Sequence, residues 1–495
     1  MSSIRVTYSG LISFAVGIVT VVTGLVFTLI VTRQLSQDEF GTWGLIGGLI
    51  SYALIIGPIV SYWSTREIAR GENSGKTALY STGCFSSLAV LIYIGIAMLM
   101  GFQGIDQNLL ILAAILVPVE FFRNILGSIS LGFKPQIGEY GLLTFEIAKI
   151  PLAILMISYW DMGLSGVILT VALASLANII VLIIKTKEKL VGKFNVSFLK
   201  KWLKLFWLPT FPRISMIFNN SDVVVYTLMT GSVGGVAYWV VSRSVSRLVR
   251  HSLRVNKGLY PKLLSGGKKQ YFQENIVRVF YFAFPLTAIS ITFARPALFA
   301  LNPIYEIVTP VIIIMSFLIF LRTLGDIFRQ ALTGLEKVDT SQKSNFIDYL
   351  KSKLFYLPLL TNIQRGVYIL SLVIMLFLLI PSSQSEIELV IFWALLALFT
   401  QIPFTIYLYS LVRKEFQPKI DHFSIMKYFI ATSVAFGLTY VVMEEFLVYD
   451  ISIFQFLPEF LKFVFLACSV YLLITYLIDK KTRKLVSAIL KEYKK

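Results

Sequence analysis

The chain has 495 residues, of which 56% are hydrophobic and only 15% are charged, and its mean hydropathy is +0.77. These values lie well beyond those of a soluble domain of this length. The net charge of +18 does not indicate a nucleic-acid partner, because the bases lie in short connections that would face an anionic membrane leaflet. Both cysteines, Cys84 and Cys468, lie inside apolar stretches, and there are only two histidines. We therefore expect no disulfide framework, no metal site and no cofactor.

Fourteen apolar stretches follow one another along the chain, each with the roughly 20 residues needed to cross about 30 Å of hydrocarbon. Their approximate ranges are 9–31, 40–65, 78–101, 108–131, 137–158, 163–185, 203–229, 232–257, 273–294, 303–333, 355–380, 387–412, 424–444 and 456–478. The first lacks a small-residue cleavage site, so we expect a retained helix and not a signal peptide. The sequence predicts an all-α polytopic membrane protein with 14 transmembrane helices.

The bases between these stretches favour alternate connections. Outside the expected spans, only Arg33 and Arg295 lie in odd-numbered connections, and the N-terminus, the even-numbered loops and the tail carry the rest. By the positive-inside rule, both termini are cytoplasmic. We expect a multi-pass protein of the cytoplasmic (inner) membrane, surrounded by membrane lipids.

A basic segment divides the expected spans into two sets of six, which predicts two pseudo-symmetric six-helix bundles plus two C-terminal helices. A modest internal match supports a repeat, because Asn124-Ile125 precedes Gly132 as Asp326-Ile327 precedes Gly334. The expected parts are an N-lobe (1–185), a cytoplasmic basic linker (186–202), a C-lobe (203–412), two appended spans (413–480) and a basic tail (481–495).

Four arginines in the eighth expected span, which we call the arginine ladder, are the strongest functional signal: Arg243, Arg247, Arg250 and Arg254. Spacings of four, three and four place them on one face of an α-helix, from the membrane midplane to the cytoplasmic mouth. A charge at that depth is costly and normally faces a bundle interior or water. Arginine forks bind phosphate oxygens bidentately, so the ladder is expected to bind an anion. Snorkelling explains Arg254 and Arg250 equally well.

Further ionisable residues inside the expected spans are candidates for cavity lining or gating: Arg213, Asp222, Arg322, Asp326, Arg329, Arg365, Glu120, Arg123, Glu146 and Lys149. The last four form two i,i+3 pairs that structural pairing also explains. Asp222, Glu120 and Glu146 are the acids that coupling to H⁺ or Na⁺ would use. Pro209 and Pro212 are expected to kink or open the seventh span beside Arg213.

Several segments resemble a known family. Leu35–Gly44 followed by Thr65–Arg70 resembles the opening of polysaccharide-transporter (Wzx-type) lipid-linked oligosaccharide flippases. The other similar segments are Leu131–Pro135, Trp207–Pro212, Asn219–Asp222, Gly235–Tyr238 and Tyr260–Leu264. The resemblance covers roughly residues 5–480.

What this resemblance implies is a central cavity between two bundles. By alternating access, such a flippase moves a polyprenyl-(di)phosphate oligosaccharide from the inner to the outer leaflet for cell-surface polysaccharide synthesis, alongside other polysaccharide-assembly proteins. The two appended spans, nearly free of interior charge, would hold the isoprenoid tail. They also separate the chain from the twelve-span multidrug extruders of the same superfamily.

Alternative functions stay open at this point. A cation-coupled drug or small-molecule exporter would prefer an acidic cavity, whereas arginines prevail here. A membrane glycosyltransferase or polymerase would need larger external loops with positioned carboxylates, and a peptidoglycan-precursor flippase remains a close relative. No Walker-type segment for ATP hydrolysis is present. We expect no catalytic residues and a transporter in place of an enzyme.

Overall fold

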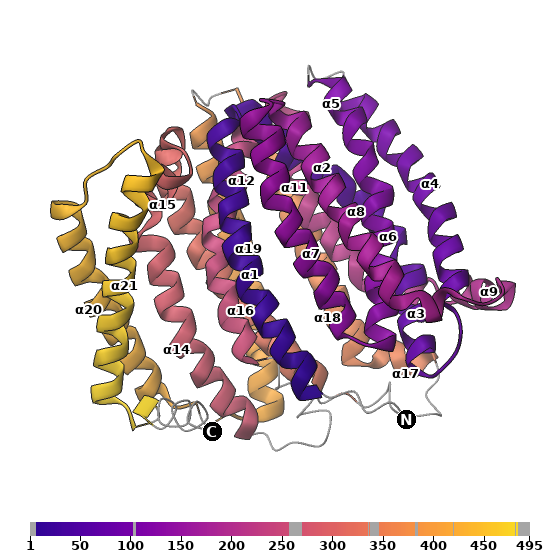
Figure 1. The fold of residues 1–495 in the computed structure, drawn as a ribbon. Helices are drawn as coiled ribbons and strands as arrows, with labels where there is room; N and C mark the ends of the chain where they lie inside the picture. The colour runs from indigo at the N-terminus through magenta and orange to yellow at the C-terminus, as the bar shows by residue number, and fades with distance from the viewer. Residues whose placement is uncertain are drawn as a thin grey trace. The chain divides into compact units, whose positions relative to one another are not determined.

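The computed structural model describes residues 6–101, 105–256, 270–334, 336, 346–381, 385–418, 420–480 and 482–483. Every regular element in these ranges is helical (Figure 1). The chain forms two compact units, Met1–Ala237 and Tyr238–Lys495. This division falls inside the eighth expected span, later in the chain than the predicted linker, so the seventh expected span folds with unit 1.

Within the described residues, unit 1 contains eleven α-helices, three short 3₁₀ helices, one π-helix and the start of α12. Its elements are α1 (Val6–Gln34), α2 (Gln37–Ala53), η1 (Leu54–Ile56), α3 (Pro58–Ala69), α4 (Gly75–Gly101), α5 (Gln107–Leu112), η2 (Ala113–Ile115), α6 (Leu116–Phe133), α7 (Gln136–Ala153), η3 (Ile154–Tyr159), α8 (Gly163–Leu190), α9 (Val196–Lys204), α10 (Trp207–Thr210), η4 (Phe211–Arg213), α11 (Ile214–Thr230) and the first turn of α12 (Gly234–Ser246). The packed neighbours within the unit include α7 with α8, α1 with α7, and α2 with α11.

A polar contact between α2 and α8 of unit 1 requires glycine at position 163. Ser36 and Glu39 form a capping box at the start of α2. The other carboxylate oxygen of Glu39 accepts from the backbone N–H of Leu164 at 3.1 Å, at the start of α8. Gly163 has a left-handed φ of 53°, and a Cβ there would lie 2.5 Å from the Glu39 carboxylate. Glycine is therefore required where Glu39 ties α2 to α8.

Unit 2 is built mainly from long helices. Its elements are the rest of α12, η5 (Arg247–Asn256), α14 (Gln270–Thr292), α15 (Ala294–Leu301), η6 (Pro303–Val308), α16 (Thr309–Gly334), α17 (Phe346–Lys351), α18 (Lys353–Leu379), α19 (Glu386–Phe416), α20 (His422–Phe446) and α21 (Ile453–Ile478). The predicted appended spans are α20 and α21, which lie side by side, with α20 against α14 (Figure 1). The Tyr471 hydroxyl donates to the Tyr281 carbonyl at 2.6 Å, so α21 shares the core of unit 2.

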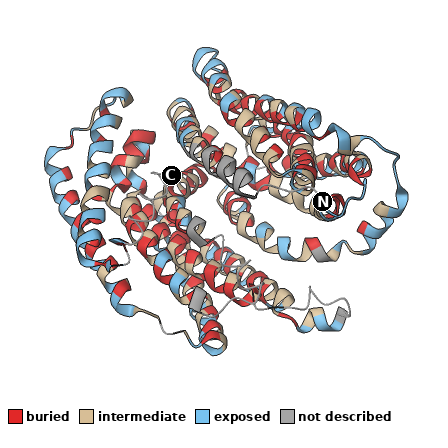
Figure 2. Ribbon diagram, turned by 60° about the horizontal axis from the view of Figure 1, so that its bottom comes forward, coloured by how far each residue is buried: buried red, intermediate tan, exposed pale blue. Residues whose placement is uncertain are grey.

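Eleven helices of the described residues are long and apolar enough to cross a membrane. Figure 2 shows a buried face and an exposed face along many of them. Large apolar side chains such as Leu91, Phe377 and Phe465 are largely exposed, as a lipid-facing surface requires. These features support a polytopic all-helical membrane protein. The count of fourteen spans and the arrangement of six, six and two helices stay predictions.

The three remaining expected spans are the first, seventh and eighth. Helix α1 has 29 residues, Val6–Gln34, and within it Val22–Gln34 is a continuous apolar segment of described side chains. The seventh is broken by the 3₁₀ turn η4 between α10 and α11, which fits the expected effect of Pro209 and Pro212. The eighth changes from α12 to the 3₁₀ helix η5 after Ser246.

Arg295, one of the two bases in odd-numbered connections, is neutralised locally. Its Nε donates to the Glu306 carboxylate at 2.8 Å, and its guanidinium lies 5.0 Å from the centre of the Tyr449 ring. The hydrogen-bonded Glu306 raises the pKa of Arg295. Burial raises the pKa of Tyr449 to about 12, which keeps this phenol neutral at physiological pH. The contact joins α15 and η6 to the connection between α20 and α21.

The predicted basic linker contains an anchored helix. Trp202 on α9 is fully buried, and its indole N–H donates to the Glu67 carboxylate of α3 at 3.1 Å. The other Glu67 oxygen accepts from Lys201 Nζ at 3.1 Å. Glu67 is itself buried, so these two donors supply the hydrogen bonds that a buried carboxylate needs. Helix α9 is thereby fastened to α3.

We predict that Trp202→Ala destabilises the protein by about 3–5 kcal/mol, because it empties a buried site and removes a donor to Glu67. Trp202→Phe keeps most of the ring and should cost about 1–3 kcal/mol for the lost hydrogen bond. Phe206→Ala is the control, since Phe206 is half exposed. Thermal unfolding of the purified protein measures all three, and equal effects of Trp202→Ala and Phe206→Ala would contradict the anchor.

Candidate functional site

A buried ion pair lies on α7 in unit 1. Lys149 Nζ donates to Glu146 Oε2 at 2.6 Å, and the two residues are 6% and 4% exposed. The same Glu146 oxygen accepts from the hydroxyl of Thr23 on α1 at 2.5 Å. Lys149 Nζ also lies 5.3 Å from the Phe27 ring centre and 5.0 Å from that of Phe145. The pair is therefore satisfied by packing and hydrogen bonding inside one unit.

The second predicted pair joins the first through an aromatic ring. On α6, Arg123 donates to Glu120 at 2.8 Å, and its guanidinium carbon lies 5.2 Å from the centre of the Phe145 ring. Lys149 also lies near this ring, so both cations contact Phe145. We call this set the unit 1 charge cluster: Thr23, Phe27, Glu120, Arg123, Phe145, Glu146 and Lys149. It holds two acids and two bases and is balanced in charge.

Around Asp326 on α16 in unit 2, basic side chains outnumber acidic ones. Asp326 pairs with Arg250 of η5, 3.2 Å away, and with Arg329 of its own helix. Arg329 donates further to the Thr361 hydroxyl of α18 at 3.1 Å. We call Arg250, Asp326, Arg329 and Thr361 the unit 2 charge cluster. One carboxylate is shared by two guanidinium groups, so the cluster keeps an excess of positive charge.

The other predicted residues on these two helices lie close in sequence to this cluster. Arg322 lies one turn before Asp326 on α16, and Arg365 lies one turn after Thr361 on α18; both are partly buried. Their helical spacing places each on the same face as its neighbour in the cluster. A role for either in lining a cavity stays a prediction.

The geometry expected for the arginine ladder is wrong beyond Ser246. Arg243 lies in α12, but Arg247, Arg250 and Arg254 lie in η5, which is a 3₁₀ helix. With three residues per turn, Arg247 and Arg250 share a face of η5. The side chain of Arg254 lies outside the described residues. The charges of both Arg243 and Arg250 act on Arg247, so Arg247 lies near each of them.

Arg243 is half-buried, and Arg247 and Arg250 are exposed. Among the described residues, no carboxylate forms an ion pair with Arg243 or Arg247, while Arg250 shares Asp326. Three clustered guanidinium groups with one shared acid form an arrangement that attracts an anion. Anion binding by the ladder itself stays a prediction.

Asp222 and Arg213 belong to neither cluster and come from the seventh expected span. Asp222 on α11 is buried, and one of its oxygens accepts from the Val223 N–H at 2.9 Å. Its neighbour Ser221 accepts from the Tyr52 hydroxyl of α2 at 2.7 Å, within the α2–α11 contact. Arg213 is exposed in η4 and donates to Met216 Sδ at 3.3 Å.

Within the described part of the chain, no three His, Cys, Asp or Glu side chains gather as metal ligands would. No protein-family profile matches the sequence, and no curated protein matches it either. The Wzx-type resemblance thus has no support from a sequence match.

Solved structures of low sequence identity share the fold. The lipid II flippase MurJ, in an inward closed conformation, matches with a TM-score of 0.64 at 14% identity, over 96% of this chain and 100% of that chain. An inward-facing multidrug resistance MATE family transporter of the MOP superfamily matches with a TM-score of 0.59 at 13% identity, over 79% and 94%. Its outward-facing conformation gives 0.50 at 14% identity, over 83% and 95%. The chain therefore has a fold similar to that of MOP-superfamily transporters.

We predict that Glu146→Gln destabilises the protein by about 3–5 kcal/mol, because it leaves the Lys149 charge buried without its partner. The double variant Glu146→Leu with Lys149→Met should be less damaging, since neither charge then remains. A double-mutant cycle with the single variants Glu146→Leu and Lys149→Met and the double variant, followed by thermal unfolding, measures the coupling.

The matched control is the exposed pair Glu459–Lys462, which has the same spacing and the same 2.6 Å distance. Lys462→Met should change stability by less than about 1 kcal/mol. A double variant at the buried pair that loses as much stability as both single losses added together would contradict the account.

Proposed function

We propose that this protein is a flippase that moves a polyprenyl-(di)phosphate-linked oligosaccharide from the inner to the outer leaflet of the cytoplasmic membrane. Two independent lines support the proposal. The fold is similar over nearly the whole chain to that of a protein described as a lipid II flippase. The sequence segments that resemble Wzx-type flippases point to the same class of substrate.

The observation that carries the proposal is the excess of guanidinium groups in unit 2. Arg247 lies near both Arg243 and Arg250. Among the described residues, the carboxylate in an ion pair with one of these three is Asp326, which Arg250 shares with Arg329. A diphosphate supplies the negative charge that this arrangement lacks. Guanidinium forks match phosphate oxygens in a bidentate way, which gives orientation as well as attraction.

Transport of such an anion needs no ATP. An inside-negative potential favours outward movement of negative charge by about 2.3 kcal/mol per charge per 100 mV. In our proposal the arginines collect the head group from the inner leaflet, and alternating access presents it to the outer side. The inner-membrane location and the cytoplasmic termini belong to this proposal.

For coupling to H⁺ or Na⁺, we propose Glu120 ahead of Glu146. Glu146 already accepts from Lys149 and Thr23 and is almost fully buried. Glu120 has one partner, Arg123, and keeps partial exposure, so an ion reaches it with less rearrangement. Asp222 is a third candidate, in the buried α2–α11 contact.

A second candidate function is export of a small molecule. The likeness to a multidrug resistance MATE family transporter favours it. A cationic drug, however, would be repelled by the clustered arginines of unit 2. The two functions therefore predict opposite ligand charges.

We predict that Arg243→Ala or Arg247→Ala weakens head-group binding roughly ten- to a hundredfold, because a charge-assisted contact is worth about 1.5–3 kcal/mol. Lysine at either position should recover part of the loss, since it keeps the charge but not the fork. Flipping of a fluorescent polyprenyl-diphosphate sugar in proteoliposomes, at equal protein abundance, measures the effect. Arg278→Ala is the control, because Arg278 is exposed on α14 of the same unit. Wild-type binding and flipping in both ladder variants would refute the anion role.

A further inference from the structure

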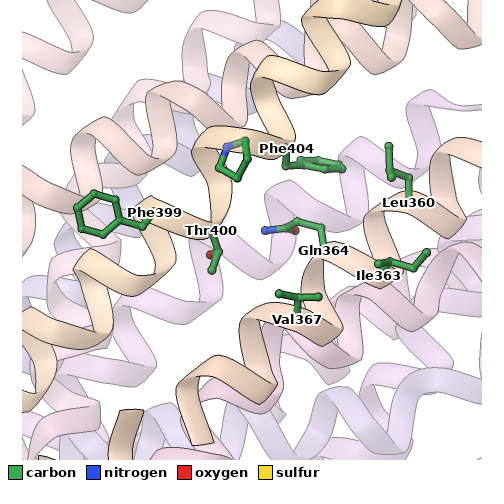
Figure 3. A pocket seen from close by; sticks show the side chains of 8 residues that line it. Leu360, Ile363, Gln364, Val367, Phe399, Thr400 and Phe404 are labelled. Atoms are coloured by element: carbon green, nitrogen blue, oxygen red, sulfur yellow. The ribbon is translucent and has the colours of Figure 1, made fainter. Parts of the chain in front are cut away.

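A pocket opens on the side of unit 2 where α18 packs against α19. It has a volume of about 400 Å³, within the usual range for small-molecule sites. Its walls are mainly apolar, from residues Leu360, Ile363, Val367, Phe399, Pro403 and Phe404, with Gln364 and Thr400 as polar members. Figure 3 shows the Gln364 amide pointing into the space between the two helices.

The Gln364 amide has no hydrogen-bond partner among the described residues. The residue is only 9% exposed, and neither its nitrogen nor its oxygen forms a hydrogen bond within the part of the chain that the structure describes. A buried amide without partners is costly, and more so in hydrocarbon, where water does not compensate. Most buried polar groups are hydrogen-bonded, so an exception of this kind calls for a bound partner.

A second acceptor lies on the opposite wall. Pro403, inside α19, has no N–H to donate to the carbonyl of Phe399, four residues earlier. The Thr400 hydroxyl donates to the carbonyls of Leu396 and Ala397, so its proton is already used. The pocket thus offers one donor group, the amide nitrogen, and three acceptors: the amide oxygen, the Phe399 carbonyl and the Thr400 hydroxyl oxygen. A hydroxyl group both donates and accepts, so it can bond the amide nitrogen and one of these acceptors.

The position of the pocket along the helices requires a neutral ligand. Gln364 lies about 16 Å along the axis from the start of α18 and about 22 Å from its end. Ile363, Val367 and Phe399 at the pocket mouth are mostly exposed, as lipid-facing residues are. Arg365 lies two residues from both Ile363 and Val367, so it points to the opposite side of α18. A charged head group at this depth would be costly.

We propose that this pocket binds a neutral, long-chain amphiphile with a single hydroxyl group, whose chain fills the apolar walls and whose hydroxyl bonds the Gln364 amide. The site is lateral on unit 2 and takes its ligand from the bilayer. It does not depend on the transported substrate.

The test uses the full chain in phosphatidylcholine nanodiscs and a diazirine-labelled long-chain alcohol as the probe. We expect cross-links to concentrate in residues 360–367 and 399–404, mapped by mass spectrometry. Unlabelled dodecan-1-ol should compete about three- to tenfold better than its methyl ether, which lacks the donor. In Gln364→Leu this preference should disappear.

Two further variants keep the test decisive. Val367→Trp narrows the mouth without touching Gln364 and should reduce labelling severalfold. Ile374→Trp, an exposed position farther along α18, should leave labelling unchanged. Cross-links spread evenly over the lipid-facing helices, or equal competition by alcohol and ether in the wild type, would overturn the proposal. Retention of the alcohol preference in Gln364→Leu would overturn it too.

Discussion

Charge inside hydrocarbon has to be satisfied by partners close at hand, and the described structure follows this constraint in two different ways. In unit 1, Glu146 receives hydrogen bonds from Lys149 and Thr23, and the cations pack around Phe145. This cluster has equal numbers of acids and bases, which pair with one another. In unit 2, Asp326 serves both Arg250 and Arg329, while Arg243 and Arg247 have no described carboxylate partner. In unit 1 the acids and bases of the cluster are paired within the unit. In unit 2 part of the positive charge has no carboxylate partner among the described residues and is left for a ligand or water.

That difference connects the fold to the proposed function. An arginine that is kept in an apolar protein without a matching acid is expensive unless a ligand or water compensates it. An anionic head group would compensate the excess and would be released when the surroundings change, which is the requirement of a transporter. The glutamine in the α18–α19 pocket follows the same rule with a neutral group, and there we infer a neutral ligand.

Much of the helical pattern could be predicted from apolar runs. The expected span 78–101 is observed as Gly75–Gly101, and 273–294 as Gln270–Thr292. Local pairs at i,i+3 were also predictable, because their geometry depends only on the helix. The 3₁₀ helix η5 could not be predicted, because spacings of three and four between its arginines are typical of an α-helix. Helix α9 was not predicted, because the lysines of this segment indicated an exposed basic linker, although Trp202 indicated a buried face.

Partners far apart in the chain could not be predicted. Thr23 meets Glu146 across 123 positions, and Trp202 meets Glu67 across 135; no local pattern connects them. Gln364 and Pro403 were visible as a polar residue and a proline inside apolar spans. Both residues are neutral, so a search for charged residues inside the spans does not identify them as a site.

The central claim is that the protein recognises an anion, and ligand-induced stabilisation tests it most directly. Purified protein would be heated with a polyprenyl-diphosphate sugar, with the same polyprenyl sugar lacking phosphate, and with a lipophilic phosphonium cation. At a hundredfold excess over Kd, a specific ligand should add about 2.7 kcal/mol of stability. Our account predicts this gain for the diphosphate compound alone. Stabilisation by the cation, with none by the diphosphate, would contradict it and favour the exporter.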